Sequence, residues 1–296
     1  MQKLSAFLVV LSIQLSLADW EESLYGVNIT LKQTSGSLRI TNGINNLRIN
    51  FKEMIELNEA GRPMDTSNGV ERNFRGFELQ RFDSSATEYI DVIGTPINIT
   101  AARANFSTTL VGPAAKLTLH ISVLDNETLI PDGDLNNTFV VHHGTVKFGF
   151  TISDWPFCGV HKLPCNNGEI GKYLDVTVAL NSWNVEASRF GFDRSRGASG
   201  FKAETYDYGG ADVTFSHMYL KNNSWHFLPT GYPKITTKDN ENVAVIRFPV
   251  FQMPVYYEST VNIRRMNLTS SSSVVVTSPS SLFLFMMWNA CVILLM

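Results

Sequence analysis

The sequence predicts an all-β protein, specifically an antiparallel β-sandwich, on three observations. Polar and apolar residues alternate with a period of two in many short segments, turn-forming pairs separate these segments, and no segment forms a convincing amphipathic helix. Alternation gives each strand one dry and one wet face, and two such sheets bury their dry faces against each other. Jelly-roll connections are compatible with this pattern, and a closed barrel is the second choice.

The first alternating segment, 25–32 (YGVNITLK), places Val27, Ile29 and Leu31 on one face and Asn28 on the other. The same period predicts further strands, in order, at 96–102, 115–124, 144–155, 172–180 and 211–219.

Two segments are less regular than these. Segment 243–251 is interpreted as a strand packed on both faces or as one broken by Pro249. Segment 49–59 is compatible with one or two helical turns, although 47–51 alternates like a strand. Turn pairs such as Asn42-Gly43 and Gly209-Gly210 separate the predicted strands.

The first 18 residues have the pattern of a secretory signal peptide. Lys3 precedes an apolar run from Leu4 to Leu17, and Ser16-Leu17-Ala18 matches a small-x-small cleavage site. The mature chain is therefore expected to begin at Asp19. The extracellular domain is predicted to span 19–265.

The last residues have the pattern of a glycosylphosphatidylinositol (GPI) anchor signal. Residues 266–273 form a predicted stalk and anchor region, and 274–296 a removable propeptide with the uncharged apolar end LFLFMMWNACVILLM. The attachment candidates are the small residues Ser270, Ser271, Ser272 and Ser273. A short transmembrane tail is the main alternative, although a bilayer span usually needs about 20 apolar residues. A free secreted protein is the third possibility.

Composition places the mature chain outside the cell as a glycosylated globular domain. Two cysteines, Cys158 and Cys165, are predicted to form a disulfide in an oxidising compartment, because Cys291 leaves with the propeptide. Seven N-x-S/T sequons predict N-linked glycans, at Asn28, Asn98, Asn105, Asn126, Asn136, Asn222 and Asn267.

The charge balance excludes a nucleic-acid-binding surface. The full chain has 24 basic and 27 acidic residues and a net charge of −3, so there is no basic field for nucleic acid or anionic lipid. This balance is also far from the acidity of an Asp-rich mineral-templating protein.

The sequence offers two metal candidates: Cys158, His161 and Cys165, for which the disulfide is preferred because a fourth ligand is not evident, and a calcium-type spacing. Asp132, Asp134 and Asn136 are spaced as in a calcium loop, but Asn137 and His143 stand where an EF-hand requires Gly and Glu. An ordinary Asp-Gly turn is the preferred interpretation, so no metal and no cofactor is predicted.

Catalytic motifs are not evident, and no catalytic residue is assigned. The chain contains neither G-x-S-x-G nor His-Glu-x-x-His. We therefore expect a protein that is not an enzyme.

The signal peptide, the glycosylated β-rich ectodomain with the run GTVKFGFTISDWPFCG, and the apolar carboxy terminus resemble a known family. Secreted or membrane-tethered proteins of the skeletal organic matrix of stony corals are similar to this chain in plan. The resemblance transfers no functional residue.

The predicted function is that of a GPI-anchored or secreted extracellular glycoprotein that acts as a matrix or recognition component. A biomineral organic matrix is one setting that fits this prediction. The expected partner is an extracellular polymer or protein. The alternatives are a cell-surface carbohydrate-active enzyme on a β-sandwich and a calcium-dependent adhesion module.

Overall fold

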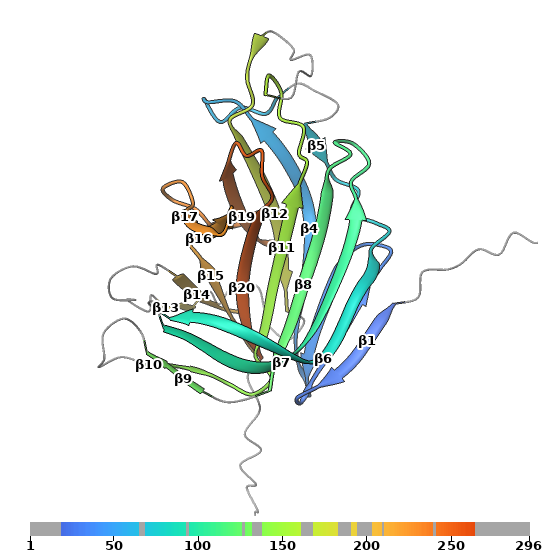
Figure 1. Ribbon diagram of the computed structural model, residues 1–296, viewed down its shortest axis with the longest axis vertical. Coiled ribbons are helices and arrows are strands. Elements are labelled where there is room, and N and C mark those ends of the chain that lie inside the picture. Colours follow the sequence, from blue (N-terminus) through green and yellow to red (C-terminus); the bar gives the residue numbers. More distant parts are fainter. Residues whose placement is uncertain are drawn as a thin grey trace, which may run out of the picture. The chain divides into compact units, whose positions relative to one another are not determined.

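The computed structural model describes residues 19–64, 69–92, 95–125, 128–131, 138–160, 168–182, 191–193, 203–208, 210–238 and 241–263. These residues form strands, turns and loops, and the part of the chain that they cover contains no α-helix. The predicted all-β class is confirmed: two antiparallel sheets pack against each other as a β-sandwich (Figure 1). None of the described residues belongs to a helix that could cross a membrane.

The first sheet, sheet A, has eight strands. Its order is β1-β2-β3-β4-β12-β19-β18, and β5 pairs with β4. Its strands are β1 (Trp20–Leu24), β2 (Val27–Lys32), β3 (Ser37–Asn42), β4 (Asn45–Leu57), β5 (Val70–Glu71), β12 (Tyr173–Asn181), β18 (Lys234–Lys238) and β19 (Glu241–Pro249).

The second sheet, sheet B, has ten strands. Its order is β13-β14-β15-β20-β11-β8-β7-β6, and the β16–β17 hairpin joins it through β20. Its strands are β6 (Glu78–Val92), β7 (Thr95–Thr109), β8 (Lys116–Leu124), β11 (Val146–Ser153), β13 (Gly191–Asp193), β14 (Ala203–Asp207), β15 (Ala211–Ser216), β16 (Met218–Lys221), β17 (Ser224–Phe227) and β20 (Val255–Ile263).

Meanders build most of both sheets. Strands β1 to β4 are consecutive neighbours in sheet A, and β6, β7 and β8 are consecutive neighbours in sheet B. A jelly roll is instead built from Greek keys. A separate hairpin consists of β9 (Thr128–Pro131) and β10 (Thr138–Val141).

The core lies between the two sheets and is rich in aromatic rings. Phe150 of β11 is 1% exposed, and its ring centroid lies 5.4 Å from that of Phe51 on the opposite sheet. Tyr257 and Phe248 complete the group, at 5.6 Å and 6.1 Å from Phe150. Such edge-on and tilted contacts add stabilisation beyond the burial of apolar area.

The predicted faces are confirmed where a strand keeps an unbroken period of two. Val27, Ile29 and Leu31 of β2 are buried, whereas Asn28 is exposed. In β12 the residues Leu174, Val176, Val178 and Leu180 all belong to the core cluster.

The uncertain segment 49–59 lies mainly in strand β4, whose period is interrupted once. The register with β12 shifts between Thr177 and Val178: Thr177 pairs with Glu53, and Val178 pairs with Phe51. Lys52 is therefore the extra residue of a β-bulge. Before the bulge, odd-numbered residues such as Phe51 point into the core. After it, even-numbered residues point inward, so Met54 and Glu56 are both buried.

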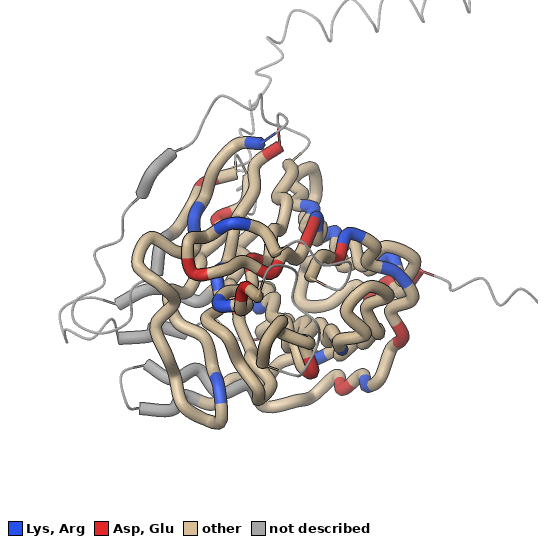
Figure 2. The backbone as a smooth tube through the Cα atoms, turned by 90° about the horizontal axis from the view of Figure 1, so that it is seen from above, with Lys and Arg blue, Asp and Glu red and all other residues tan. Residues whose placement is uncertain are grey.

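Acidic and basic residues are interspersed along the chain. Figure 2 shows Lys and Arg positions lying between Asp and Glu positions over the described backbone. Neighbouring charges of opposite sign form ion pairs, for example between Lys238 and Glu53.

Candidate functional site

The structure places four of the seven sequon asparagines. Asn28, Asn98 and Asn222 are exposed, and Asn105 is half-buried in the middle of β7. Asn222 and its neighbour Asn223 form the tip of the β16–β17 hairpin, with φ of 50° and 57°, as a two-residue type I′ turn requires. Glycosylation at these positions stays a prediction.

The other predicted site residues lie largely outside the described residues. This applies to the remaining sequon asparagines, the calcium candidates, one cysteine of the disulfide and the anchor serines: Asn126, Asn136, Asn267, Asp132, Asp134, Cys165, Ser270, Ser271, Ser272 and Ser273. Within the described ranges, no group of three or more His, Cys, Asp or Glu side chains could hold a metal ion.

Cys158 occupies a buried loop that is held by a carboxylate from the other sheet. Its backbone N–H donates to Oε1 of Glu56 at 2.8 Å, and the indole N–H of Trp155 donates to Oε2 at 3.4 Å. Glu56 is 0% exposed, and sequence analysis missed this role. A signal existed in the sequence, because Glu56 lies between the apolar residues Ile55 and Leu57.

The outer face of sheet B carries a continuous row of side chains across six strands. Direct register partners define the row, from β7 through β8, β11, β20 and β16 to β17: Ser107, Thr118, Thr151, Tyr256, Leu220 and Trp225. Directly opposed residues point to the same face of a sheet, and neighbouring strands lie about 4.8 Å apart, so the row is about 24 Å long.

A second row runs beside the first, two residues further along each strand. It contains Arg81, Asn105, His120, Gly149 and Glu258. We call the two rows together the sheet B platform.

His120 links the two rows of the platform. Its Nδ1 lies 3.0 Å from Oδ1 of Asn105, and its Nε2 lies 2.8 Å from the hydroxyl of Thr151. The imidazole also meets the ring of Tyr256 edge-on, with centroids 5.4 Å apart. This network fixes the orientation of the imidazole and of the tyrosine ring.

Gly149 lets the ring of Tyr256 lie close to the sheet. A Cβ at this glycine would come within 2.9 Å of Cε2 and the hydroxyl oxygen of Tyr256, and 3.0 Å from the carbonyl oxygen of Tyr257.

The Tyr256 hydroxyl donates to Glu258 at 2.6 Å, and Glu258 is paired with Lys147 at 3.0 Å. The only carboxylate of the platform is therefore neutralised by a lysine whose side chain is 8% exposed.

The β16–β17 hairpin extends the platform with aromatic side chains. Trp225 is half-buried opposite Leu220, and Phe227, two residues further on, is 59% exposed. Single exposed apolar side chains are common in monomeric proteins and do not by themselves indicate a binding site. Trp225 and Phe227 are notable because they lie beside the polar side chains of the platform.

The outer face of sheet A is polar in a different way, because its charges neutralise one another. Asp175 accepts two hydrogen bonds from Arg247, at 2.6 Å and 2.7 Å, and thereby raises the pKa of the guanidinium. At the bulge of β4, Nζ of Lys52 lies 2.5 Å from Oε2 of Glu241. The next residue, Glu53, forms ion pairs with both Arg72 and Lys238.

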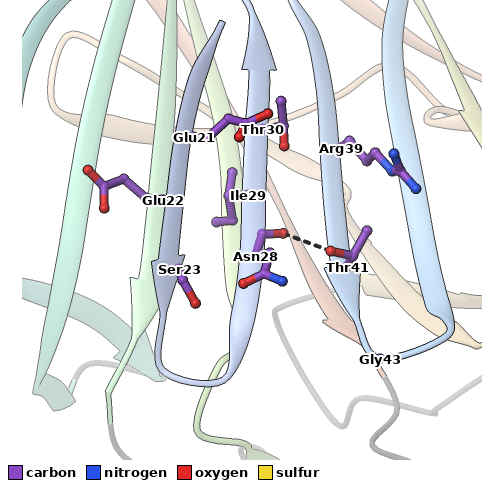
Figure 3. Close-up of a pocket in the computed structure, with 9 residues that line it drawn as sticks. All are labelled: Glu21, Glu22, Ser23, Asn28, Ile29, Thr30, Arg39, Thr41 and Gly43. Atoms are coloured by element: carbon purple, nitrogen blue, oxygen red, sulfur yellow. Dashed lines mark hydrogen bonds between the residues drawn. The ribbon is translucent and has the colours of Figure 1, made fainter.

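A shallow, open hollow of about 460 Å³ lies over β1, β2 and β3 on this face. Figure 3 shows Glu21 and Thr30 toward one end, Arg39 to one side, and Asn28 between Ser23 and Thr41. The Thr41 hydroxyl donates to the backbone carbonyl of Asn28 at 3.4 Å.

The protein is therefore an antiparallel β-sandwich with two polar outer faces. Ion pairs dominate the outer face of sheet A, and hydroxyl, amide and aromatic groups dominate that of sheet B. No solved structure matches the chain with significant similarity.

A family model, acidic skeletal organic matrix protein, matches residues 41–295. The chain belongs to this family, and the predicted resemblance to skeletal organic matrix proteins is confirmed. Membership implies secretion into an extracellular matrix.

Proposed function

We propose that this chain is a non-enzymatic component of the extracellular skeletal organic matrix, and that it binds a polysaccharide of that matrix through the sheet B platform. The observation that carries the proposal is the six-strand row on a chain that belongs to a matrix family: all of its side chains except Leu220 are hydroxyl-bearing or aromatic.

The chemistry of the platform suits a sugar polymer. A pyranose ring has an apolar face of C–H groups, which packs on aromatic rings such as those of Trp225 and Tyr256. Its equatorial hydroxyls both donate and accept, as do the hydroxyls of Thr118 and Thr151. A row about 24 Å long contacts several successive sugars of an extended chain and not one small molecule.

The charge of the platform favours a neutral polymer over mineral. Calcium at a crystal surface is bound by carboxylate oxygens that are free of cations. Glu258 is engaged by Lys147 and by the Tyr256 hydroxyl. The organic phase of the matrix is therefore the proposed partner, although the family is described as acidic.

The protein is proposed to reach its site as a GPI-anchored, glycosylated surface protein that is retained at the membrane or deposited in the matrix. The terminal sequence pattern and the extension of the family match to residue 295 support this proposal. Phosphatidylinositol-specific phospholipase C, applied to intact cells that express the full chain, is expected to release it. Retention on the cells would favour a membrane-spanning tail.

Binding is tested with the full-length chain from animal cells, solubilised in mild detergent and mixed with insoluble polysaccharides. Chitin and cellulose serve as neutral probes, and calcium alginate serves as an acidic one. We expect depletion by a neutral probe and a loss of about fivefold or more for Trp225→Ala, because truncating an aromatic residue that acts as a binding hot spot costs over about 1 kcal/mol.

The matched control is Phe82→Ala. Phe82 of β6 is 39% exposed and packs against Trp20. It lies on the opposite face of sheet B from the platform, because it pairs with the core residue Ala104. Unchanged binding by Trp225→Ala, or no affinity of the wild-type chain for any polysaccharide, would contradict the proposal. Ser107→Ala removes both the sequon of Asn105 and one hydroxyl of the platform, so stronger binding by this variant would show that a glycan on Asn105 covers the platform.

A further inference from the structure

We propose that the hollow over β1, β2 and β3 is the seat of the first sugars of the chain's own N-linked glycan on Asn28. Glu21, Thr30, Arg39 and Thr41 hold these sugars against sheet A. The inference is independent of polysaccharide binding by the platform on the other sheet.

Strand register places the attachment point inside the hollow. Asn28 lies directly opposite Ser23 of β1 and Thr41 of β3, and its side chain is exposed. Thr30, two residues on, shares the face of Asn28, so both the acceptor and the hydroxyl of the sequon line the same hollow.

The next row of residues supplies hydrogen-bonding groups at the right separation. Thr30 lies directly between Glu21 and Arg39 in the register. This row is two residues from Asn28, or about 6.7 Å along the strand, which is a distance that one pyranose ring can bridge. A carboxylate accepts from sugar hydroxyls and a guanidinium donates to them.

The attachment is the ordinary reaction of the secretory pathway. The amide Nδ2 of Asn28 forms a bond to C1 of the first N-acetylhexosamine and loses one proton. The bond from C1 to the diphosphate of a lipid-linked oligosaccharide donor breaks, and the lipid diphosphate leaves with the bonding electrons. The sequon is modified in the extended chain, and folding then forms the hollow beneath the sugar.

A glycan in this seat lies next to an edge of sheet A. Strand β1 is the terminal strand of the sheet order and pairs with β2 alone among the described strands. An uncovered edge can pair with a strand of another chain. A sugar fixed beside β1 obstructs such pairing by its bulk.

Asn222 provides an internal comparison. It lies at the tip of a two-residue turn, where it is exposed together with Asn223 and Ser224. A glycan there projects beyond the ends of β16 and β17 and does not lie over a sheet face. The two sites therefore differ in their surroundings while they share one chain and one preparation; the sequon of Asn28 ends in Thr30 and that of Asn222 in Ser224.

The experiment measures the release of each glycan from the folded full-length chain by peptide-N-glycosidase, quantified by mass spectrometry of the Asn28 and Asn222 peptides. We expect Asn28 to be occupied and its release to be about tenfold slower than at Asn222, the factor that one or two net hydrogen bonds supply. Prior denaturation should bring the two rates together.

Two variants separate the seat from general crowding by the sheet. Arg39→Ala and Glu21→Gln keep the sequon and are expected to speed release at Asn28 without changing release at Asn222. The proposal is overturned if Asn28 is unoccupied, if the two sites release equally in the folded chain, or if neither variant changes the rate at Asn28. Unchanged thermal unfolding of each variant verifies that it has folded.

Discussion

Replacing Glu56 should reveal how strongly one buried carboxylate holds the loop of Cys158. The Glu56 side chain is fully buried and accepts the backbone N–H of Cys158 and the indole N–H of Trp155. Glu56→Ala removes this acceptor from both donors at once. The donors cannot both recover water, because Trp155 is 1% exposed and Cys158 is 2% exposed.

The expected loss is about 3 kcal/mol of unfolding free energy. A buried donor left without its acceptor costs about 1–3 kcal/mol. The bond to Cys158, at 2.8 Å, falls in the upper part of this range, and the bond to Trp155, at 3.4 Å, falls at its lower end. For a domain of this size about 1 kcal/mol shifts the melting temperature by about 2–4 °C, so we expect a fall of about 6–12 °C.

Thermal unfolding of the full chain, followed by near-ultraviolet circular dichroism, measures the effect. Glu56→Gln keeps one acceptor oxygen and should lose less. Gly171→Ala should approach the loss of Glu56→Ala, because a Cβ at Gly171 would lie 1.8 Å from Oε1 of Glu56. The exposed residue Glu59 supplies the control, Glu59→Ala, which should change stability by no more than about 0.5 kcal/mol. If Glu56→Ala behaves like this control, the reasoning is wrong.

Two further predictions concern the outer faces. Gly149→Val should push the Tyr256 ring away from its place over the sheet and reduce polysaccharide binding about as much as Trp225→Ala; unchanged binding would argue against a role for this ring. The hydrogen bond from Lys52 lowers the pKa of Glu241, so its stabilisation is complete above the carboxyl's ordinary pKa and is lost as the pH falls through the lowered value. The difference in melting temperature between wild type and Glu241→Gln should therefore correspond to less than about 1 kcal/mol near neutral pH and vanish in acid; a difference that persists in acid would point to packing as its origin.

Strand alternation predicted the fold class because most strands of this protein have one dry face. Strands β2, β11 and β12 show this directly, with every second residue in the core cluster. Strand β4 was ambiguous for a physical reason: the bulge at Lys52 breaks the period of two and brings Met54 into the inward phase. The pairing partner that reveals a bulge lies more than a hundred residues away, at Thr177, and local sequence does not contain it.

The candidate site was harder to predict than the fold. The two platform rows consist of residues from β6, β7, β8, β11, β20, β16 and β17, which are spread from Arg81 to Glu258. The predicted strand 115–124 contains His120, but sequence alone could not bring this residue to Asn105 or Tyr256. Register between strands creates these contacts, and register is a tertiary property. The sequons, by contrast, are local patterns and were found directly.

The contrast between the two outer faces bears on which of them meets a partner. On the part of sheet A formed by β4, β12, β18 and β19, cations and carboxylates are matched within the sheet, as in the bidentate pair of Arg247 with Asp175. Binding a neutral ligand there would require these pairs to be desolvated or separated. On the platform, groups such as Thr118 and Thr151 retain hydrogen-bonding capacity after their contacts within the sheet are made, because a hydroxyl has one donor and two acceptor sites. A sugar chain can therefore bind to sheet B without breaking an ion pair there. It follows that substituting Trp225 should weaken binding more than breaking the Arg247 pair, even though breaking that pair should cost more stability.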